Sequence, residues 1–231
     1  CEMADNHIKA VKALAAAPRG LTRQERIDTC GLSSGGRTTL MLHELEESGF
    51  IRSAIPFGKN SKDVIYRLID EFSIFYLRFM DKLKAPGKDA WMKLSAGATY
   101  KIWCGMAFEA VCLKHIDQLK EGLGIQTVET VENAWRHVPA KGRPESGAQI
   151  DLLIDRQDRC ISICEMKFST GPFVIDKAYA ASLQQKMDVF RKVTHTRKTL
   201  FLTMITTYGV KENNYAASML QRSLTMDALF A

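Results

Sequence analysis

Gly-Ala-Gln-Ile-Asp-Leu-Leu-Ile-Asp at residues 147–155 and Ile-Ser-Ile-Cys-Glu-Met-Lys at residues 161–167 are two short apolar segments separated by a few polar residues. This pattern predicts two β-strands joined by a tight turn. Each strand carries charge where a buried strand would carry none: Asp151 in the first, Glu165 and Lys167 in the second. These misplaced charges are the clearest functional signal in the chain.

The three charged side chains are expected to lie on one face of the hairpin. Successive side chains of a strand alternate between its faces, so Glu165 and Lys167 share a face. If the hairpin loop is 157–159, Asp151 lies directly opposite Glu165 on that face. Two carboxylates and a lysine gathered in this way can hold a divalent cation and orient a water against a phosphate. The alternative is an edge hairpin whose charges face water or pair with one another.

An Asp followed by Glu-x-Lys on the adjacent strand resembles the core of the PD-(D/E)xK nucleases. The resemblance implies that Asp151 and Glu165 ligate Mg²⁺ or Mn²⁺ and that Lys167 positions or activates the attacking water. The family usually adds a carboxylate from a preceding helix, and Glu109 fits that role. The proline of the family's name is absent, since Ile150 precedes Asp151, but that position varies within the superfamily.

Residues 96–231 predict one unit with a mixed sheet flanked by helices. In order, we expect a helix over about 98–119, a strand over 125–131, the hairpin, a helix over about 177–193, a buried strand over 199–205 and a final helix from about residue 214. This α-β-β-β-α-β order is the one that a restriction-endonuclease-like fold requires, so the predicted class is α/β (α+β).

The helix after the Glu-x-Lys strand holds a further group of polar candidates. They are Lys177, Gln184, Gln185 and Lys186. Some PD-(D/E)xK relatives place a phosphate-contacting residue on this helix, and Lys186 is the best candidate of the four. The alternative is that these side chains form a solvated helix face.

Residues 1–70 predict a separate unit of three helices followed by a two-stranded hairpin, the order of a winged helix. In that arrangement the third helix, here about 37–48 with Leu40, Leu42 and Leu45 as apolar contacts, enters the DNA major groove, and the hairpin touches the backbone. Its candidate nucleic-acid contacts are Arg37, Thr38, Thr39, His43, Lys59 and Lys62.

The alternative for this unit is a protein-docking module. Glu44, Glu46 and Glu47 place three negative charges on the helix that would face DNA, and a DNA-reading helix rarely carries so many acids. Residues 71–95 are predicted to form a helical linker to the second unit.

The bulk composition is that of a globular protein with a basic surface. The chain has 231 residues, 46% of them hydrophobic, with a net charge of +6, which is compatible with nucleic acid. No apolar run approaches the ~20 residues that span a bilayer, and no signal peptide is visible. The six cysteines form no C-x-x-C pair, which argues against zinc and suits a reducing cytoplasm. We therefore expect a cytoplasmic protein without a membrane partner.

Nearly the whole chain is similar to the C-terminal region of archaeal-type P-loop AAA-like ATPases of prokaryotes. The matching segments are residues 66–70, 75–79, 105–109, 147–151, 164–168 and 206–209. The resemblance implies a winged helix and a PD-(D/E)xK nuclease-like region, preceded in the parent protein by an ATPase domain. No G-x-x-x-x-G-K-[ST] loop is present, so this chain should not bind ATP. It begins with Cys1 and not methionine, and we expect it to be part of a longer protein.

Three functions follow as hypotheses. The first is a metal-dependent nuclease that hydrolyses phosphodiesters of DNA, or of RNA, with a metal-activated water. The second is a catalytically inactive nuclease-fold module that binds DNA or a protein partner. The third is a regulator that acts through the winged helix alone. The sequence indicates neither the substrate nor the oligomeric state.

Overall fold

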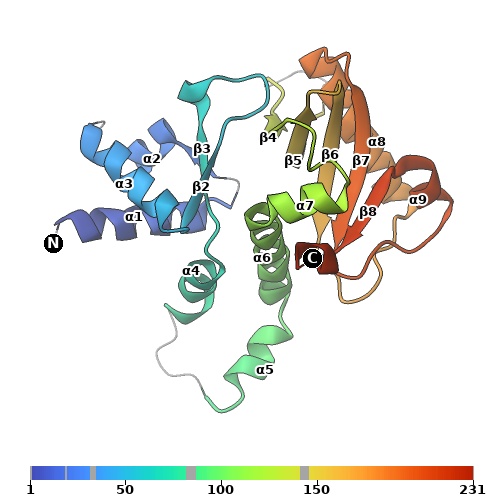
Figure 1. The fold of residues 1–231 in the computed structure, drawn as a ribbon. Coiled ribbons are helices and arrows are strands. Elements are labelled where there is room, and N and C mark those ends of the chain that lie inside the picture. Colours follow the sequence, from blue (N-terminus) through green and yellow to red (C-terminus); the bar gives the residue numbers. More distant parts are fainter. Residues whose placement is uncertain (1, 19, 32–34, 82–86, 141–145, 231) are drawn as a thin grey trace. The chain divides into compact units, whose positions relative to one another are not determined.

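The chain forms two compact units, each with its own hydrophobic core. The computed structural model describes residues 2–18, 20–31, 35–81, 87–140 and 146–230. The first unit comprises Cys1–Ile55 and Lys59–Ala110, and the second Pro56–Gly58 and Val111–Ala231. Figure 1 shows the elements of both.

The first unit is mainly helical, with a small sheet. Its elements are α1 (Glu2–Ala16), β1 (Leu21–Thr22), α2 (Arg23–Cys30), α3 (Gly36–Glu47), β2 (Ile51–Ala54), the 3-10 turn η1 (Ser61–Asp63), β3 (Ile65–Leu68), α4 (Glu71–Phe75), the π-helical turn η2 (Tyr76–Met80), α5 (Ala90–Ser95) and most of α6 (Ala98–Lys114). The three strands are antiparallel in the order β1-β3-β2.

Helix α3 shows how the sequence places the core of this unit. Thr38, Met41, Leu42 and Leu45 are buried at the i, i+3, i+4, i+7 spacing of a helix stripe. The expectation that Leu40 is a core contact is wrong, because it lies off this stripe and is 54% exposed. The buried residues of α1 and α3 pack with residues of β2, β3 and α4.

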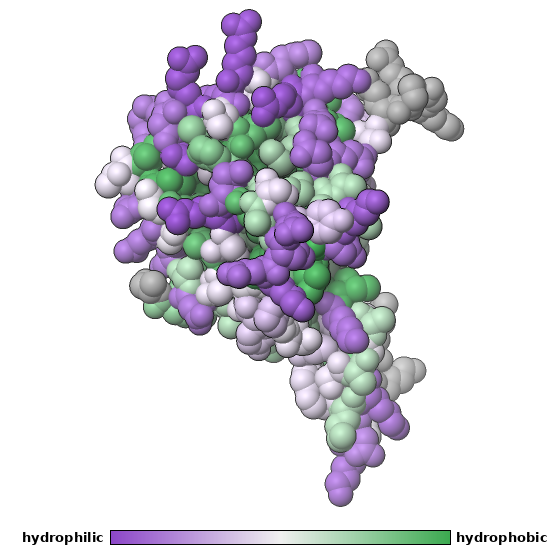
Figure 2. Space-filling view, turned by 90° about the vertical axis from the view of Figure 1, so that its right-hand side faces the viewer, coloured by the Kyte–Doolittle hydropathy of each residue, from purple (hydrophilic) through white to green (hydrophobic). Residues whose placement is uncertain are grey.

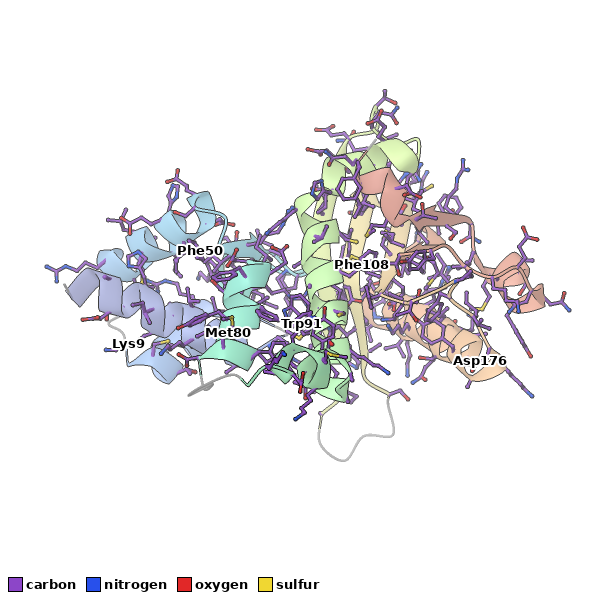
Figure 3. The ribbon with its side chains drawn as sticks, turned by 90° about the horizontal axis from the view of Figure 1, so that it is seen from below. Lys9, Phe50, Met80, Trp91, Phe108 and Asp176 are labelled. Carbon is purple, nitrogen blue, oxygen red and sulfur yellow. The ribbon has the colours of Figure 1, made fainter. Side chains whose placement is uncertain are left out.

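The described residues of segment 71–95, predicted as a linker, belong to the first unit. An aromatic cluster joins this segment to α6. Phe75 and Phe79 lie 5.1 Å apart between ring centroids, Phe75 and Trp103 5.2 Å, and Trp91 and Tyr100 5.5 Å. Offset and edge-to-face contacts at these distances stabilise beyond simple burial. Trp91, a member of this cluster, is labelled in Figure 3.

The second unit is built on a five-stranded mixed sheet in the order β4-β5-β6-β7-β8. Its elements are the end of α6, α7 (Ile116–Gly122), β4 (Thr130–His137), β5 (Ala148–Arg156), β6 (Cys160–Lys167), α8 (Lys177–Thr194), β7 (Thr199–Thr206), α9 (Asn214–Met219), β8 (Arg222–Thr225) and the 3-10 turn η3 (Met226–Leu229). The pairs β4–β5 and β5–β6 are antiparallel, and β6–β7 and β7–β8 are parallel. The α/β class and the mixed sheet expected from the sequence are confirmed.

Two helices lie on opposite faces of this sheet. Ile161 and Ile163 on β6 pack in the core with Leu183 and Phe190 of α8. The alternate positions Ser162 of β6 and Thr203 of β7 line a pocket together with residues 123–125, which follow α7. Figure 1 shows α7 in front of the sheet and α8 behind it. Asp176, labelled in Figure 3, is the N-cap residue of α8. Its carboxylate accepts a hydrogen bond from the Tyr179 amide at 2.7 Å.

Two sequence expectations for this unit need correction. The single helix over 98–119 is divided at His115 into α6 and α7. The strand expected at 125–131 begins only at Thr130, because Ile125 is buried by closing the end of α7, where its amide bonds to the Lys120 carbonyl. The apolar alternation there came from a helix cap and a turn. Strand β8 was not expected.

The part of the chain that the structure describes contains no helix long and apolar enough to cross a membrane. Figure 2 shows hydrophilic side chains spread over the face that it draws, with hydrophobic residues scattered among them. Cys112 and Cys164 are buried, and burial raises the pKa of the Cys164 thiol to about 12. A thiol with so high a pKa is inert at neutral pH, as befits a core residue.

Candidate functional site

The hairpin of β5 and β6 has the geometry on which the candidate site depends. Its loop is 157–159, and Leu152 pairs with Cys164 and Leu153 with Ile163. Continued by one residue, this register places Asp151 opposite Glu165. The charge of Asp151 acts on Glu165 and raises its pKa, which agrees with that placement. The hairpin therefore presents both carboxylates on the face of the sheet that α8 covers.

Both carboxylates are withdrawn from water. Asp151 is 9% exposed and Glu165 is fully buried at 0%. Burial raises the pKa of Glu165, and the charge of Asp151 raises it further, while Lys186 and Lys167 act in the opposite direction. Burial of a charged carboxylate costs free energy unless a cation lies near it. A positive charge beside Asp151 and Glu165 would therefore stabilise the folded unit.

Two lysines, one on α8 and one on β6, supply positive charge near Glu165. Lys186 of α8 donates to both oxygens of Glu165, with Nζ at 2.6 Å from Oε1 and 2.7 Å from Oε2. Lys167 on β6 is more distant, with Nζ at 3.8 Å from Glu165 Oε2. Lys186 therefore lies in the site and does not belong to a solvated helix face. Sequence reasoning placed it near the site but missed the direct contact with Glu165.

Tyr179 is a member of the site that sequence reasoning missed. Its hydroxyl is buried and has no hydrogen-bond partner among the described residues. Burial raises the pKa of the phenol, and the charges of Glu165 and Asp151 raise it further. Tyr179 precedes Lys186 by seven residues, two helical turns, so both lie on the sheet-facing side of α8. That spacing is the signal that could have identified it.

The donor set in the second unit fits a hard divalent cation of the magnesium type. Mg²⁺ is commonly held by one or two carboxylates, with waters and substrate phosphates completing the octahedron. Asp151 and Glu165 supply the two carboxylates, and a cationic nitrogen already contacts both oxygens of Glu165. Among the described residues no group of three or more His, Cys, Asp or Glu side chains is arranged to hold a metal.

Glu109 stays a prediction as a third ligand. It lies on α6, within the part of that helix that belongs to the first unit. Asp151 and Glu165 belong to the second unit. Within the second unit, the structure brings together the other three predicted catalytic residues, Asp151, Glu165 and Lys167.

The predicted nucleic-acid contacts of the first unit differ in exposure. Arg37, His43, Lys59 and Lys62 are exposed. Thr38 is only 6% exposed, because it is part of the buried stripe of α3, so its side chain does not face a ligand. Thr39 is exposed and accepts a hydrogen bond from Arg23 at 3.3 Å.

The three acids of α3 are engaged within the unit. Glu44 Oε2 lies 2.8 Å from His7 Nε2, and Glu46 Oε1 accepts a hydrogen bond from the Ser53 amide at 2.8 Å. Glu47 lies 3.6 Å from His43. These contacts occupy the C-terminal half of α3, whereas Arg37 lies at its start. The acids therefore argue less strongly against DNA binding than the sequence alone indicates.

A scan against protein-family models and searches of curated proteins and of solved structures find no match to this chain. The similarity to PD-(D/E)xK nucleases and to archaeal-type AAA-like ATPases therefore stays a prediction from sequence motifs.

Proposed function

We propose that the second unit is a metal-dependent nuclease of the PD-(D/E)xK type. The observation that carries this proposal is the convergence of Asp151, fully buried Glu165 and two lysines on one face of the sheet. A helical segment, three antiparallel strands, the crossover helix α8 and the parallel strand β7 follow one another in the order of that fold.

Each side chain has a defined role in the proposed reaction. Asp151 and Glu165 would hold Mg²⁺ or Mn²⁺, which would supply Lewis-acid charge to the phosphate and lower the pKa of a water. Lys167, less tightly engaged with Glu165 than Lys186 is, can orient the nucleophilic water and stabilise negative charge on the phosphate. The Tyr179 hydroxyl is a donor with no competing partner among the described residues.

The experiment that tests the nuclease is a cleavage screen. Single-stranded DNA, duplex DNA and RNA are incubated with the purified chain and Mg²⁺ or Mn²⁺, and EDTA removes the metal in a parallel series. We expect cleavage of at least one substrate that depends on the metal and is lost in Lys167→Met. Cleavage that continues in EDTA, or equally in Lys167→Met, would contradict the proposal.

Lys186 is expected to compete with the metal for Glu165. Because its ammonium contacts both carboxylate oxygens, it competes with an incoming cation for them. We expect Lys186→Met to lower the melting temperature in EDTA, since Glu165 is left buried with its main counter-charge removed. At pH 8 the variant should bind Mn²⁺ about tenfold more tightly than the unaltered chain, by loss of one charge-assisted competitor.

Calorimetric titration of Mn²⁺ checks this prediction. Lys177→Met is the matched control, because Lys177 is an exposed lysine in the first turn of the same helix and its loss should change neither quantity. Equal Mn²⁺ affinity in Lys186→Met and the unaltered chain would show that the ammonium does not occupy the metal's place.

We infer a second function, DNA binding by a winged helix in the first unit, because the acids of α3 lie in its C-terminal half, away from Arg37. The order α1-β1-α2-α3-β2-β3, with β2 and β3 as an antiparallel hairpin, supports this fold. Arg37 at the start of α3 and Lys62 between the two strands are exposed and have the charge that phosphates attract.

Substitution of Arg37 and of Lys62 tests the contact of α3 and the contact of the hairpin with DNA separately. Arg37→Gln should weaken duplex binding by about tenfold, and Lys62→Gln should lower the slope of affinity against salt by about one. Fluorescence anisotropy at several salt concentrations measures both. Lys93→Gln, at an exposed lysine of α5, removes the same charge and should leave binding unchanged. Equal weakening by Lys93→Gln would indicate non-specific attraction.

A further inference from the structure

The second unit contains a pocket with a mixed polar and apolar lining on the face of the sheet opposite the carboxylate site. Its volume is about 260 Å³. It is bounded by the segment after α7 and by strands β5 to β8. The polar and aromatic residues that line it are Arg156, Ser162, Phe201, Thr203, Gln221 and Arg222. Ser162 alternates with Ile161 and Ile163, which belong to the core under α8, so this pocket is separate from Glu165.

Two hydroxyl residues stand in the lining where an ordinary sheet core would be apolar. Ser162 is 3% exposed and Thr203 is 1% exposed. Ser162 pairs with Phe201 across β6 and β7, and Thr203 pairs with Arg222 across β7 and β8. A hydroxyl that lines a pocket can donate a hydrogen bond to a polar occupant, so Ser162 and Thr203 make this pocket suitable for a polar ligand.

The charge of the lining is positive. Two arginines line the pocket and none of its lining residues is a carboxylate. The guanidinium of Arg156 is held in place by an ion pair with Asp158 and lies 5.8 Å from the centroid of the Phe201 ring. Arg222 is exposed, and the described residues form no ion pair with it. The positive charge of Arg222 is therefore left for a ligand.

We propose that this pocket binds the phosphate group of a small phosphate monoester. The planar guanidinium fork of Arg222 matches phosphate oxygens and supplies the positive charge, since the charge of Arg156 is compensated by Asp158; Ser162 and Thr203 supply hydroxyl donors. The volume of 260 Å³ is several times the ~30 Å³ of one water and slightly below the usual range for drug-sized ligands. A 5′-mononucleotide is thus the largest ligand expected. The proposal does not depend on the nuclease assignment, since the two sites lie on opposite faces.

Calorimetry with inorganic phosphate, AMP and adenosine tests this proposal on the full chain. We expect phosphate and AMP to bind and adenosine not to bind. Tighter binding of AMP would identify a nucleotide as the ligand, and equal binding would identify free phosphate; both support phosphate recognition. Arg222→Gln should weaken binding by about tenfold or more. Arg191→Gln, at an exposed arginine of α8 on the other face, should not.

Absence of binding by both phosphate and AMP would overturn the proposal. So would equal weakening by Arg222→Gln and Arg191→Gln, which would show non-specific attraction to a basic surface. Ser162→Ala and Thr203→Val test the base of the pocket, because each removes a hydroxyl with little change of volume. Both variants should keep the melting temperature and lose phosphate affinity. Unchanged affinity in both would place the anion outside this pocket.

Discussion

Asp151→Asn should eliminate metal binding while leaving the second unit folded. The substitution keeps the shape of the side chain and removes the charge that a divalent cation needs. Loss of an outer-shell partner already costs a metal site roughly 10- to 100-fold, so loss of a carboxylate ligand should weaken Mn²⁺ binding by at least about a hundredfold. Cleavage should disappear with it, because the two carboxylates act together.

The stability of this variant should not fall. The negative charge of Asp151 raises the pKa of Glu165, which means that the two carboxylates repel each other in the absence of metal. Asp151→Asn removes that repulsion, and its amide oxygen can still accept the hydrogen bond that Gln149 donates at 3.4 Å. We therefore expect a melting temperature in EDTA equal to or above that of the unaltered chain.

Mn²⁺ calorimetry and a thermal melt measure these two effects. Asp155→Asn is the matched control, since Asp155 lies on the same strand and bonds to Lys198 at 2.5 Å, away from Glu165. It should bind Mn²⁺ like the unaltered chain. Retained Mn²⁺ affinity in Asp151→Asn would refute the proposed metal centre, and a large fall in its melting temperature would show that Asp151 is structural.

Phe190→Ala should cause the largest loss of stability in the second unit. Phe190 is fully buried on α8, with its ring centroid 5.0 Å from that of Trp135 on β4 and 5.3 Å from that of Phe57. Truncation of a buried phenylalanine removes its burial and leaves a cavity, at a cost of about 3–5 kcal/mol. That is a large part of the 5–15 kcal/mol by which domains are typically stable.

Urea unfolding followed by tryptophan fluorescence measures this loss. Phe230→Ala is the control, because the same side chain is truncated at a position that is 73% exposed. Its free energy of unfolding should change by less than about 0.5 kcal/mol. A loss below about 1 kcal/mol in Phe190→Ala would mean that α8 packs less tightly on the sheet than described.

Much of the second unit could be predicted because its signals are local. The spans of β5, β6, α8 and β7 follow from short apolar strands, a tight turn and a helix of ordinary length. The prediction of a strand over 125–131 is wrong because Ile125 is apolar for a different reason: it closes the end of α7. Strand β8 was missed because its residues are exposed or only partly buried and show no apolar run.

In the first unit too, local periodicity predicts a helix correctly but not which of its side chains are buried. The stripe of α3 follows helical periodicity, but Leu40 is apolar and exposed while Thr38 is polar and buried. Composition alone cannot separate such residues, because the direction of a side chain depends on the phase of the helix relative to its neighbours. Thr38 is therefore not a surface contact, whereas Arg37, His43, Lys59 and Lys62 are exposed.

The sequence by itself determined which residues share a face of the hairpin, because strand alternation and a three-residue loop set the register of Asp151, Glu165 and Lys167. Tertiary structure decided that Lys186 contacts both oxygens of Glu165 and that Tyr179 lies beside the carboxylates. It also decided that Ser162, Thr203 and Arg222 line one pocket. The sequence could not reveal these contacts because the residues that form them are far apart along the chain. These groups come from separate elements, and only the packing of helices against the two faces of the sheet brings them together.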